Sequence, residues 1–418
     1  MGLLIKNGLL YTGSGFIKRD LLCRDSLIAE IGEDISGEGY GEYIDAENLV
    51  VSPGFVDLHT HLREPGASYK ETISTGTAAA VAGGFTTVCA MPNLNPVPDS
   101  AENLVVQQEI IARDARCQVL PFMSITLRRM GVHVTSPVAG CVGISDDGSG
   151  VQSEEVMAEA MNQAARRDIL ISAHCEDENL VSEGGCVHDG VLAKNGLAGI
   201  SSESEYLQLQ RDLRLVEKYR CRYHVCHVST KESIGMVRKA KSDGLPVSCE
   251  VTPHHALLCE DDVVCDDGRF KMAPPLRSSQ DRSALVGALL DGTVDAIATD
   301  HAPHAAFEKN RGLKDSAMGV VGLECAFAAL YTDLVKTAVM PFERLLFLLT
   351  FGPSNVIKLP CGLEIGNKAN ITLIDPNATW VIDSREFFSK GRSTPFDGKK
   401  VAGKVVSTIF EGKKVYQL

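Results

Sequence analysis

The stretch Gly54-Phe55-Val56-Asp57-Leu58-His59-Thr60-His61 predicts a buried strand that ends in two histidines. Side chains two positions apart on a strand point to the same face, so His59 and His61 can reach one metal ion. Similar apolar runs recur along the middle of the chain, near residues 85–91, 117–123, 141–145, 169–174, 222–227, 246–251 and 294–299. The chain therefore has eight candidate strands.

Helical patterns separate most of these runs, at 71–83, 153–167, 203–220, 230–243 and 280–291. No clean helix lies between the third and fourth runs, and the connection 252–279 is long. Regular alternation of strand and helix is typical of a parallel α/β fold, and eight repeats predict a (β/α)8 TIM-like barrel.

The two ends of the chain differ from this middle. Residues 1–52 and 362–418 contain short strand-like runs and turns, with little helical pattern. We expect them to pair into one accessory domain, a small β-sandwich, beside a barrel of residues 53–361. A single barrel of about 250 residues or more is common, so the length of 418 residues fits this division.

Composition excludes several classes of protein. The net charge of −13 argues against a nucleic-acid or anionic-membrane surface, which needs clustered Lys and Arg. No apolar run reaches the ~20 residues that a membrane helix needs. The thirteen cysteines are odd in number and form no C-x-x-C pair. They predict reduced thiols and a cytoplasmic location.

Six residues that bind metals well lie where the predicted strands end: His59, His61, Asp147, His174, His227 and Asp300. Barrel enzymes place their chemistry at the carboxyl ends of the strands, so we expect these side chains to meet. Taken singly, each is more often a structural polar residue, but their shared position favours a metal site. Four imidazoles and two carboxylates suffice for two zinc-like ions.

The ligand types indicate the chemistry. Mixed His and carboxylate ligation suits a catalytic ion with an open position. Asp147 can bridge two ions through its two oxygens, and Asp300 is the candidate proton shuttle. An ion in such a site activates water, which predicts metal-assisted hydrolysis, or its reverse, at a carbonyl carbon.

Three further residues suggest the substrate. The guanidinium of Arg63 suits a carboxylate held by two hydrogen bonds. Asn93 offers both a donor and an acceptor after the second strand, and His304 lies four residues beyond Asp300. Each is more often an ordinary surface or turn residue, but together they predict a small acid that bears an amide.

At these residues the chain resembles the class I bacterial dihydroorotases of the amidohydrolase superfamily. The segment that carries the resemblance most clearly is Asp57-Leu58-His59-Thr60-His61-Leu62-Arg63-Glu64-Pro65-Gly66. Matching motifs continue to the end of the barrel, at residues 90–93, 145–148, 173–176, 225–229, 252–255 and 298–304. These enzymes interconvert N-carbamoyl-L-aspartate and L-dihydroorotate in pyrimidine (UMP) synthesis.

The resemblance implies a role for each residue. It assigns His59, His61 and Asp300 to one zinc, His174 and His227 to a second, and Asp147 to the bridge. The carboxylated-lysine bridge of dihydropyrimidinases would need a lysine near Asp147, and the sequence has none there. The chain is therefore similar to the aspartate-bridged branch. The substrate contacts that it implies are His61, Arg63, Asn93, Ala273, His304, Met318 and Gly319. His254 and His255 belong to the motif but are interpreted as supporting residues.

The resemblance also suggests partners. They are a small-molecule substrate, a second copy in a homodimer, and an aspartate transcarbamoylase. Neither a nucleic acid nor a membrane is expected.

Two departures from the family leave alternatives open. Ala273 stands where the family commonly has an asparagine that helps to hold the substrate, and Ala317 stands where a proline is frequent. A cyclic amidohydrolase for another substrate, such as hydantoin or allantoin, therefore remains an alternative. A non-catalytic partner of aspartate transcarbamoylase and a metal-storage protein are two others, although all six ligands are present. The segment 305–319 is compatible with a lid and equally with a plain surface loop.

Overall fold

The middle of the chain forms the predicted barrel. In the computed structural model, which describes residues 2–35, 40–190, 192–193 and 196–418, eight parallel strands are hydrogen-bonded in sequence order. They are β6 (Phe55–Thr60), β7 (Phe85–Ala90), β8 (Gln118–Met123), β9 (Gly143–Ile144), β10 (Leu170–Ala173), β13 (Arg222–Val225), β14 (Val247–Val251) and β15 (Ala296–Ile297). The backbone N–H of His61 donates to the His301 carbonyl at 2.8 Å and closes the ring between β6 and the end of β15.

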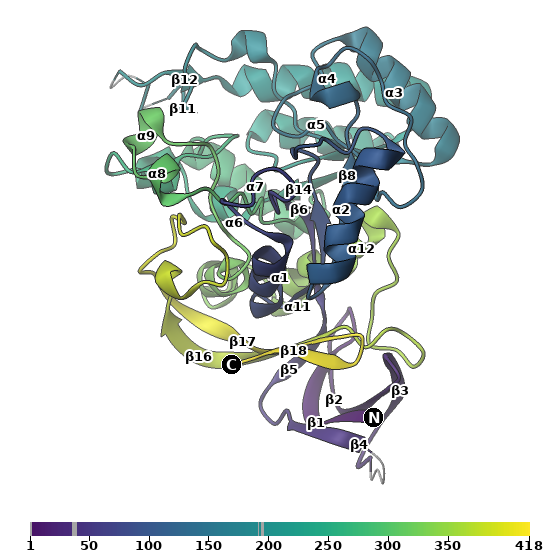
Figure 1. Ribbon diagram of the computed structural model, residues 1–418. Coiled ribbons are helices and arrows are strands. Elements are labelled where there is room, and N and C mark those ends of the chain that lie inside the picture. The colour runs from purple at the N-terminus through teal and green to yellow at the C-terminus, as the bar shows by residue number, and fades with distance from the viewer. Residues whose placement is uncertain (1, 36–39, 191, 194–195) are drawn as a thin grey trace.

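Helices surround the barrel (Figure 1). The longer ones are α1 (Ile73–Ala82), α2 (Ala101–Asp114), α3 (Glu154–Arg167), α4 (Ser202–Tyr219), α5 (Lys231–Ser242), α7 (Ser279–Asp291), α11 (Phe342–Leu349) and α12 (Phe351–Ile357). Ser or Thr side chains cap most of their first turns; Thr72, for example, accepts a hydrogen bond from the Thr75 backbone. The sequence patterns predicted five of these helices and missed α2, α11 and α12.

Shorter elements lie in the connections. They are the helices α6 (Pro253–Leu257), α8 (Ala306–Lys309), α9 (Gly312–Asp315) and α10 (Ala326–Leu330), and the strands β11 (Val187–His188) and β12 (Gly199–Ile200). Short 3-10 turns are η1 (Leu127–Arg129), η2 (Glu178–Leu180), η4 (Glu260–Asp262), η5 (Gly268–Phe270) and η7 (Ser384–Glu386), and η6 (Tyr331–Val335) is a π-turn. Between β8 and β9 the described chain has only the turn η1, as the missing helical pattern predicted.

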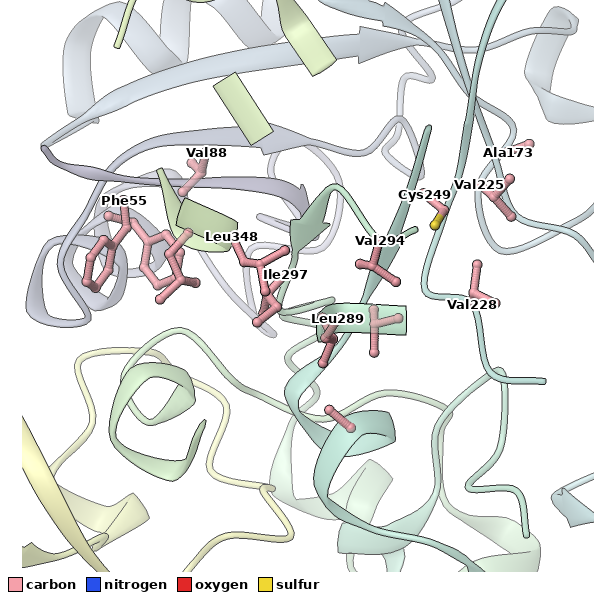
Figure 2. Packing of buried hydrophobic residues seen from close by; sticks show 14 of the residues in the cluster. Phe55, Val88, Ala173, Val225, Val228, Cys249, Leu289, Val294, Ile297 and Leu348 are labelled. Carbon is pink, nitrogen blue, oxygen red and sulfur yellow. The ribbon is translucent and has the colours of Figure 1, made fainter. Parts of the chain in front are cut away.

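Apolar side chains from strands and helices pack together between the barrel wall and its helices. Figure 2 shows Val88 of β7 and Ile297 of β15 in this cluster, together with Leu289 of α7 and Leu348 of α11. Each is fully buried. Removing this apolar surface from water, at about 25 cal/mol per Å², stabilises the arrangement that holds the strand ends in place.

The two ends of the chain pair into one sheet at the far end of the barrel (Figure 1). Its strands are β1 (Gly2–Tyr11), β2 (Phe16–Arg24), β3 (Leu27–Gly32), β4 (Tyr40–Asp45), β5 (Val50–Pro53), β16 (Ile371–Val381), β17 (Lys400–Phe410) and β18 (Lys413–Gln417). Antiparallel pairing of Val51 with Leu373 joins the N-terminal strands to the C-terminal ones. The expected pairing of the termini is confirmed, and the bounds 1–52 plus 362–418 and 53–361 stay a prediction.

This sheet lies at the amino ends of the first barrel strands. The Gly54 backbone donates to the Asn370 carbonyl at 2.9 Å, and the Thr372 hydroxyl donates to the Gly84 carbonyl at 2.6 Å. The carboxyl ends, where the candidate ligands were placed, are therefore left free on the opposite side.

Two further expectations can be compared with the structure. All thirteen cysteines, each within the described chain, are free thiols, and most are buried. Among the described residues no helix is long and apolar enough to cross a bilayer.

Candidate active site

The six predicted ligands meet at the carboxyl ends of the strands, and all six are buried. Asp147 lies at the centre. Its Oδ1 is 3.2 Å from His59 Nε2 and 3.6 Å from His227 Nε2, and its Oδ2 is 3.4 Å from His61 Nε2. Asp300 Oδ1 is 3.1 Å from His61 Nε2 and 3.6 Å from His59 Nε2. The strand ends thus bring together residues up to 241 positions apart (59 to 300).

These distances fit a metal ion. Ligand atoms at the corners of a tetrahedron with bonds of about 2.0–2.1 Å are separated by about 3.3 Å. Two buried polar atoms of the site, His59 Nε2 and Asp147 Oδ1, have no hydrogen-bond partner among the described residues. A buried polar atom without a partner is costly, and a cation between these two atoms removes that cost. The residues present therefore fit a metal.

Two groups of atoms in the site could each hold an ion. One group is His59, His61 and Asp300, and another is His59, Asp147 and His227. His174 adds to the second, because its Nδ1 lies 3.0 Å from His227 Nε2 and 3.8 Å from Asp147 Oδ1. Asp147 belongs to the second group through Oδ1, and its Oδ2 lies 3.4 Å from His61 Nε2 of the first, which is the position that a bridging carboxylate requires.

Glu250 orients His59 and was missed by the sequence analysis. This buried residue of β14 places Oε1 at 2.9 Å from His59 Nδ1 and Oε2 at 3.0 Å from His224 Nε2. Burial alone would raise the pKa of Glu250, but hydrogen bonds from His224 and His59 lower it to about 2. The carboxylate therefore accepts the Nδ1–H of His59 and turns the Nε2 lone pair toward Asp147 and Asp300.

Asn93 orients His61 in the same way. Its side-chain oxygen lies 2.7 Å from His61 Nδ1, and its amide nitrogen donates to Asp147 Oδ2 at 3.3 Å. The sequence analysis expected Asn93 to contact substrate. The structure places it at the wall of the cavity, where it also holds two of the ligands.

The two neighbouring aspartates, Asp146 and Asp147, have different roles. Asp146 accepts hydrogen bonds from the backbones of Ile125 and Thr126, at 2.8 and 3.1 Å, and so fixes the loop after β8. Asp147 instead faces the histidines. Burial would raise the pKa of Asp147, but the charge of the adjacent His59 keeps it well below the ordinary value. The second aspartate is therefore the one available to a cation.

Three residues of the site have a strained backbone. Arg63, His227 and Asp300 have φ angles of 59°, 30° and 46°, in the left-handed region that residues with a Cβ rarely adopt. Such conformations cost about 1–3 kcal/mol each and tend to persist at functional sites. Here they turn three side chains away from their strands and into one space.

That space is a cavity of about 270 Å³ above the ligands. It is lined by every predicted substrate contact, namely His61, Arg63, Asn93, Ala273, His304, Met318 and Gly319, and also by Glu176, Val181 and Ile200 from loops that the sequence analysis did not single out. No lysine is among the described lining residues. The geometry thus brings the predicted contacts together, while their roles remain predictions.

A glycine is required at position 319 of the cavity wall. Gly319 has φ +125°, and a Cβ there would lie 2.7 Å from the Ala302 Cβ and 3.3 Å from His304 Nε2. Any side chain would therefore clash. The bare backbone can approach a bound molecule closely.

Arg63 and His304 share one side of the cavity. Arg63 Nε donates to the Pro303 carbonyl at 3.2 Å, and its Nη2 lies 3.3 Å from His304 Nε2. Lys70, which the sequence analysis did not identify, places its ammonium 3.2 Å from His304 Nδ1 and 2.8 Å from a carboxylate oxygen of Glu308. Arg63 and His304 thus face the space above the ligands, and Lys70 lies against the Nδ1 side of the His304 ring.

The segment 305–319 is packed against the barrel. It forms α8 and α9, and the buried ammonium of Lys309 donates to the carbonyls of Lys271, Ala317 and Gly319 at 3.0, 2.9 and 2.7 Å. His255, expected to be structural, bonds the Thr252 hydroxyl and the Pro274 carbonyl, at 2.7 and 3.0 Å. Lys309 and His255 thus both support the loops that form the cavity wall.

Comparisons with known proteins agree with this geometry. A family model described as Dihydro-orotase-like matches residues 48–233. A curated dihydroorotase of Geobacillus sp. (strain WCH70) is 47% identical over 424 aligned positions, covering 100% of this chain and 99% of the relative. One from Bacillus pumilus (strain SAFR-032) is 48% identical over 424 positions, with the same coverage of 100% and 99%.

Solved structures with the same architecture are cyclic-amide hydrolases. The L-hydantoinase (dihydropyrimidinase) from Arthrobacter aurescens superposes with a TM-score of 0.90 at 25% identity, covering 99% of this chain and 96% of that one. A dihydropyrimidinase from Brevibacillus agri NCHU1002 has a TM-score of 0.88 at 20% identity, covering 100% and 95%. Because its identity is only 20%, the likeness to the Brevibacillus agri enzyme shows that the barrel fold is shared and nothing more.

Proposed function

The chain belongs to the dihydroorotase family, and from this membership we propose that it interconverts N-carbamoyl-L-aspartate and L-dihydroorotate, the ring-closing step of pyrimidine (UMP) synthesis. The observation that carries the proposal is the meeting of all six ligand residues beneath a cavity lined by Arg63, Asn93 and His304. The family is metal-dependent, and a storage protein or an inactive partner would not need such a wall beside the ligands.

The site would hold two zinc ions. His59, His61 and Asp300 would bind one, His174 and His227 the other, and Asp147 would bridge them. When bound, zinc supplies Lewis-acid chemistry that activates a water molecule and polarises the carbonyl that is attacked. The absence of lysine from the described cavity wall favours the aspartate bridge over a carboxylated lysine.

Asp300 would carry the proton in both directions. Burial would raise its pKa, but the hydrogen bond with His61 and the charge of His59 hold it below the ordinary value. Asp300 is therefore ionised and can accept the proton of the attacking water. It then delivers that proton to the amide nitrogen that leaves as the ring opens, and ring closure uses the same steps in reverse.

The cavity wall would bind the acid. Arg63 provides donors for the substrate carboxylate, His304 lies beside Arg63 in the wall, and Asn93 faces the amide. Met318 and Gly319 offer backbone groups, while Ala273 offers no side-chain donor. The negative net charge of −13 makes this local cluster important for drawing in an anionic substrate.

Assembly and location are proposed on the family resemblance alone. We expect a homodimer in the cytoplasm, and an association with aspartate transcarbamoylase stays a prediction. The division into a barrel of residues 53–361 and an accessory domain of 1–52 plus 362–418 likewise stays a proposal.

Hydantoin or allantoin hydrolysis is the second candidate, favoured by Ala273 and by the likeness to an L-hydantoinase. One experiment separates the two. The zinc-loaded enzyme is offered dihydroorotate, dihydrouracil, hydantoin and allantoin separately, and ring opening is followed for each. We expect efficient opening of dihydroorotate only. Opening of another ring, with dihydroorotate untouched, would overturn the assignment.

A further inference from the structure

His304 lies between two neighbours that both constrain its protons. Lys70 Nζ is 3.2 Å from Nδ1, and the Met318 carbonyl oxygen is 2.6 Å from Nε2. An ammonium only donates, so Nδ1 must be the unprotonated acceptor. A carbonyl only accepts, so Nε2 must carry the hydrogen. The two neighbours therefore require the same neutral tautomer, with the proton on Nε2.

The ammonium of Lys70 is itself fixed in place. Glu308 of α8 holds it through Oε1 at 2.8 Å. The same carboxylate accepts a hydrogen bond from the Tyr69 hydroxyl at 3.1 Å and one from the Ala305 backbone at 2.9 Å. Lys70 and Glu308 have side chains that are each only 17% exposed. The lysine therefore has a defined position beside the ring.

This tautomer has a consequence for Arg63. Its Nη2 lies 3.3 Å from His304 Nε2, and both nitrogens then carry hydrogen. Two donors cannot bond each other. The Nε2 hydrogen of His304 is taken by the Met318 carbonyl, so the Nη2 hydrogens of Arg63 are left to face the cavity that both side chains line. A carboxylate is the acceptor that a guanidinium suits best.

We propose that Lys70 is a positioning residue that holds His304 in its Nε2–H tautomer, so that His304 bonds the Met318 carbonyl and leaves Arg63 free to donate to the substrate carboxylate. This inference rests on the proposed function, which supplies a substrate with a carboxylate. Lys70 acts through His304 and does not itself line the cavity.

Removing the ammonium would have a specific effect, because Glu308 Oε2 lies 3.6 Å from His304 Nδ1. Without Lys70, the carboxylate would attract a proton to Nδ1. In the neutral ring Nε2 would then lose its hydrogen bond to the Met318 carbonyl and would accept one from Arg63 Nη2 instead. Arg63 would be drawn toward the ring, and its binding of the substrate carboxylate would weaken.

The pH dependence follows from the charges around the ring. Arg63, Lys70, Lys309 and Glu308 are the charged groups that face it. Burial and then the charges of Arg63 and Lys70 lower the pKa of His304 to about 3, so the ring stays neutral at working pH. Removing Lys70 raises this pKa, because a cation is lost and the carboxylate of Glu308 remains. In the protein without Lys70, both nitrogens of the His304 ring carry a hydrogen when the pH is below this raised pKa. At a higher pH, Nε2 carries none.

The test combines protonation of the ring with kinetics. Zinc-loaded wild type, Lys70→Met, Lys70→Arg and the double variant Lys70→Met/Glu308→Gln are labelled with ¹⁵N-histidine. The ring signals of His304 are assigned by their loss in His304→Gln. We expect the proton on Nε2 in wild type and in Lys70→Arg, and on Nδ1 in Lys70→Met. The double variant lacks the attracting carboxylate and should return the proton to Nε2.

The kinetic expectation is a split between binding and turnover. Loss of a donor to a charged group raises KM for dihydroorotate about tenfold or more in Lys70→Met at pH 8, with kcat within about twofold. This rise should shrink at pH 6, and Lys70→Arg should restore KM. A merely structural role would lower zinc content and kcat together, without this pH dependence.

The outcomes separate this inference from the proposed function. A proton on Nδ1 in wild type, or an unchanged tautomer and KM in Lys70→Met, would refute the role of Lys70. The ring spectrum needs no substrate. If the enzyme does not open dihydroorotate but shows the expected tautomers, the proposed function is refuted. The role of Lys70 in fixing the tautomer of His304 is then still supported.

Discussion

Glu250 allows the sharpest test of how the site is built, since it touches a metal ligand without being one. Its carboxylate accepts from His59 at 2.9 Å and from His224 at 3.0 Å, and its side chain is fully buried. Glu250→Gln keeps the volume and one acceptor but removes the charge. Glu250→Ala removes both and leaves the Nδ1–H of His59 without a partner.

The expected magnitude follows from these two contacts. A hydrogen bond to a charged group contributes about 1.5–3 kcal/mol, and loss of such a partner of a metal-binding histidine typically lowers metal affinity 10–100-fold. We therefore expect about tenfold weaker zinc binding in Glu250→Gln. In Glu250→Ala we expect zinc binding to be nearer a hundredfold weaker, because a buried donor is left without a hydrogen-bond partner.

The assay is the zinc dissociation constant, measured by competition with a chelator of known affinity. Ser248→Ala is the matched control. Ser248 lies on the same strand and bonds the far side of His224 at 2.8 Å, without a bond to His59. Its zinc affinity should stay within about twofold of wild type. Wild-type affinity in a folded Glu250→Ala variant would refute the reasoning that Glu250 orients His59.

Three further predictions test other parts of the account. Asp300→Asn removes the proton carrier and should lower ring closure and ring opening alike, by about 10²–10⁴-fold; near-normal turnover in either direction would place the shuttle elsewhere. Ala273→Asn should leave kcat/KM for dihydroorotate unchanged or raise it by a factor of about 2 to 13, the worth of one neutral hydrogen bond, and a clear loss would contradict the assigned position of residue 273. Burial raises the pKa of Glu324 to about 7 from an ordinary 4.5, so its contribution to stability is present below pH 4.5 and is lost as pH rises through 7. Glu324→Gln should abolish that loss, about 3 kcal/mol, when unfolding free energies are compared at pH 4.5 and 8; an equal pH dependence in both proteins would show that Glu324 is ionised throughout.

The sequence predicted the barrel because its signals are local. Buried parallel strands are apolar runs, and the ligands follow those runs directly, as His59 and Asp300 do. Helix α2 was missed because its apolar pattern is misleading. Val105 and Val106 are 46% and 38% exposed, whereas Gln107 is buried. Gln107 is buried although neither polar atom of its side chain has a hydrogen-bond partner among the described residues, so polarity does not show which face of the helix is inside.

The supporting residues of the site were harder to predict, since their partners are remote in sequence. Glu250 meets His59 across 191 positions, and Lys70 meets His304 across 234. A charged residue inside an apolar strand, such as Glu250 in Val247–Val251, is the one local signal that was available. Nothing near Lys70 distinguishes it from an ordinary surface lysine until the fold brings Glu308 to its side.

The most direct test of the central claim is zinc content per chain, measured together with carbamoyl-aspartate cyclisation on the same preparation. We predict about two zinc ions per chain. Cyclisation should be lost when a chelator removes them and should return in proportion to the zinc restored. Full cyclisation by the metal-free protein, or none by a fully loaded one, would contradict the account.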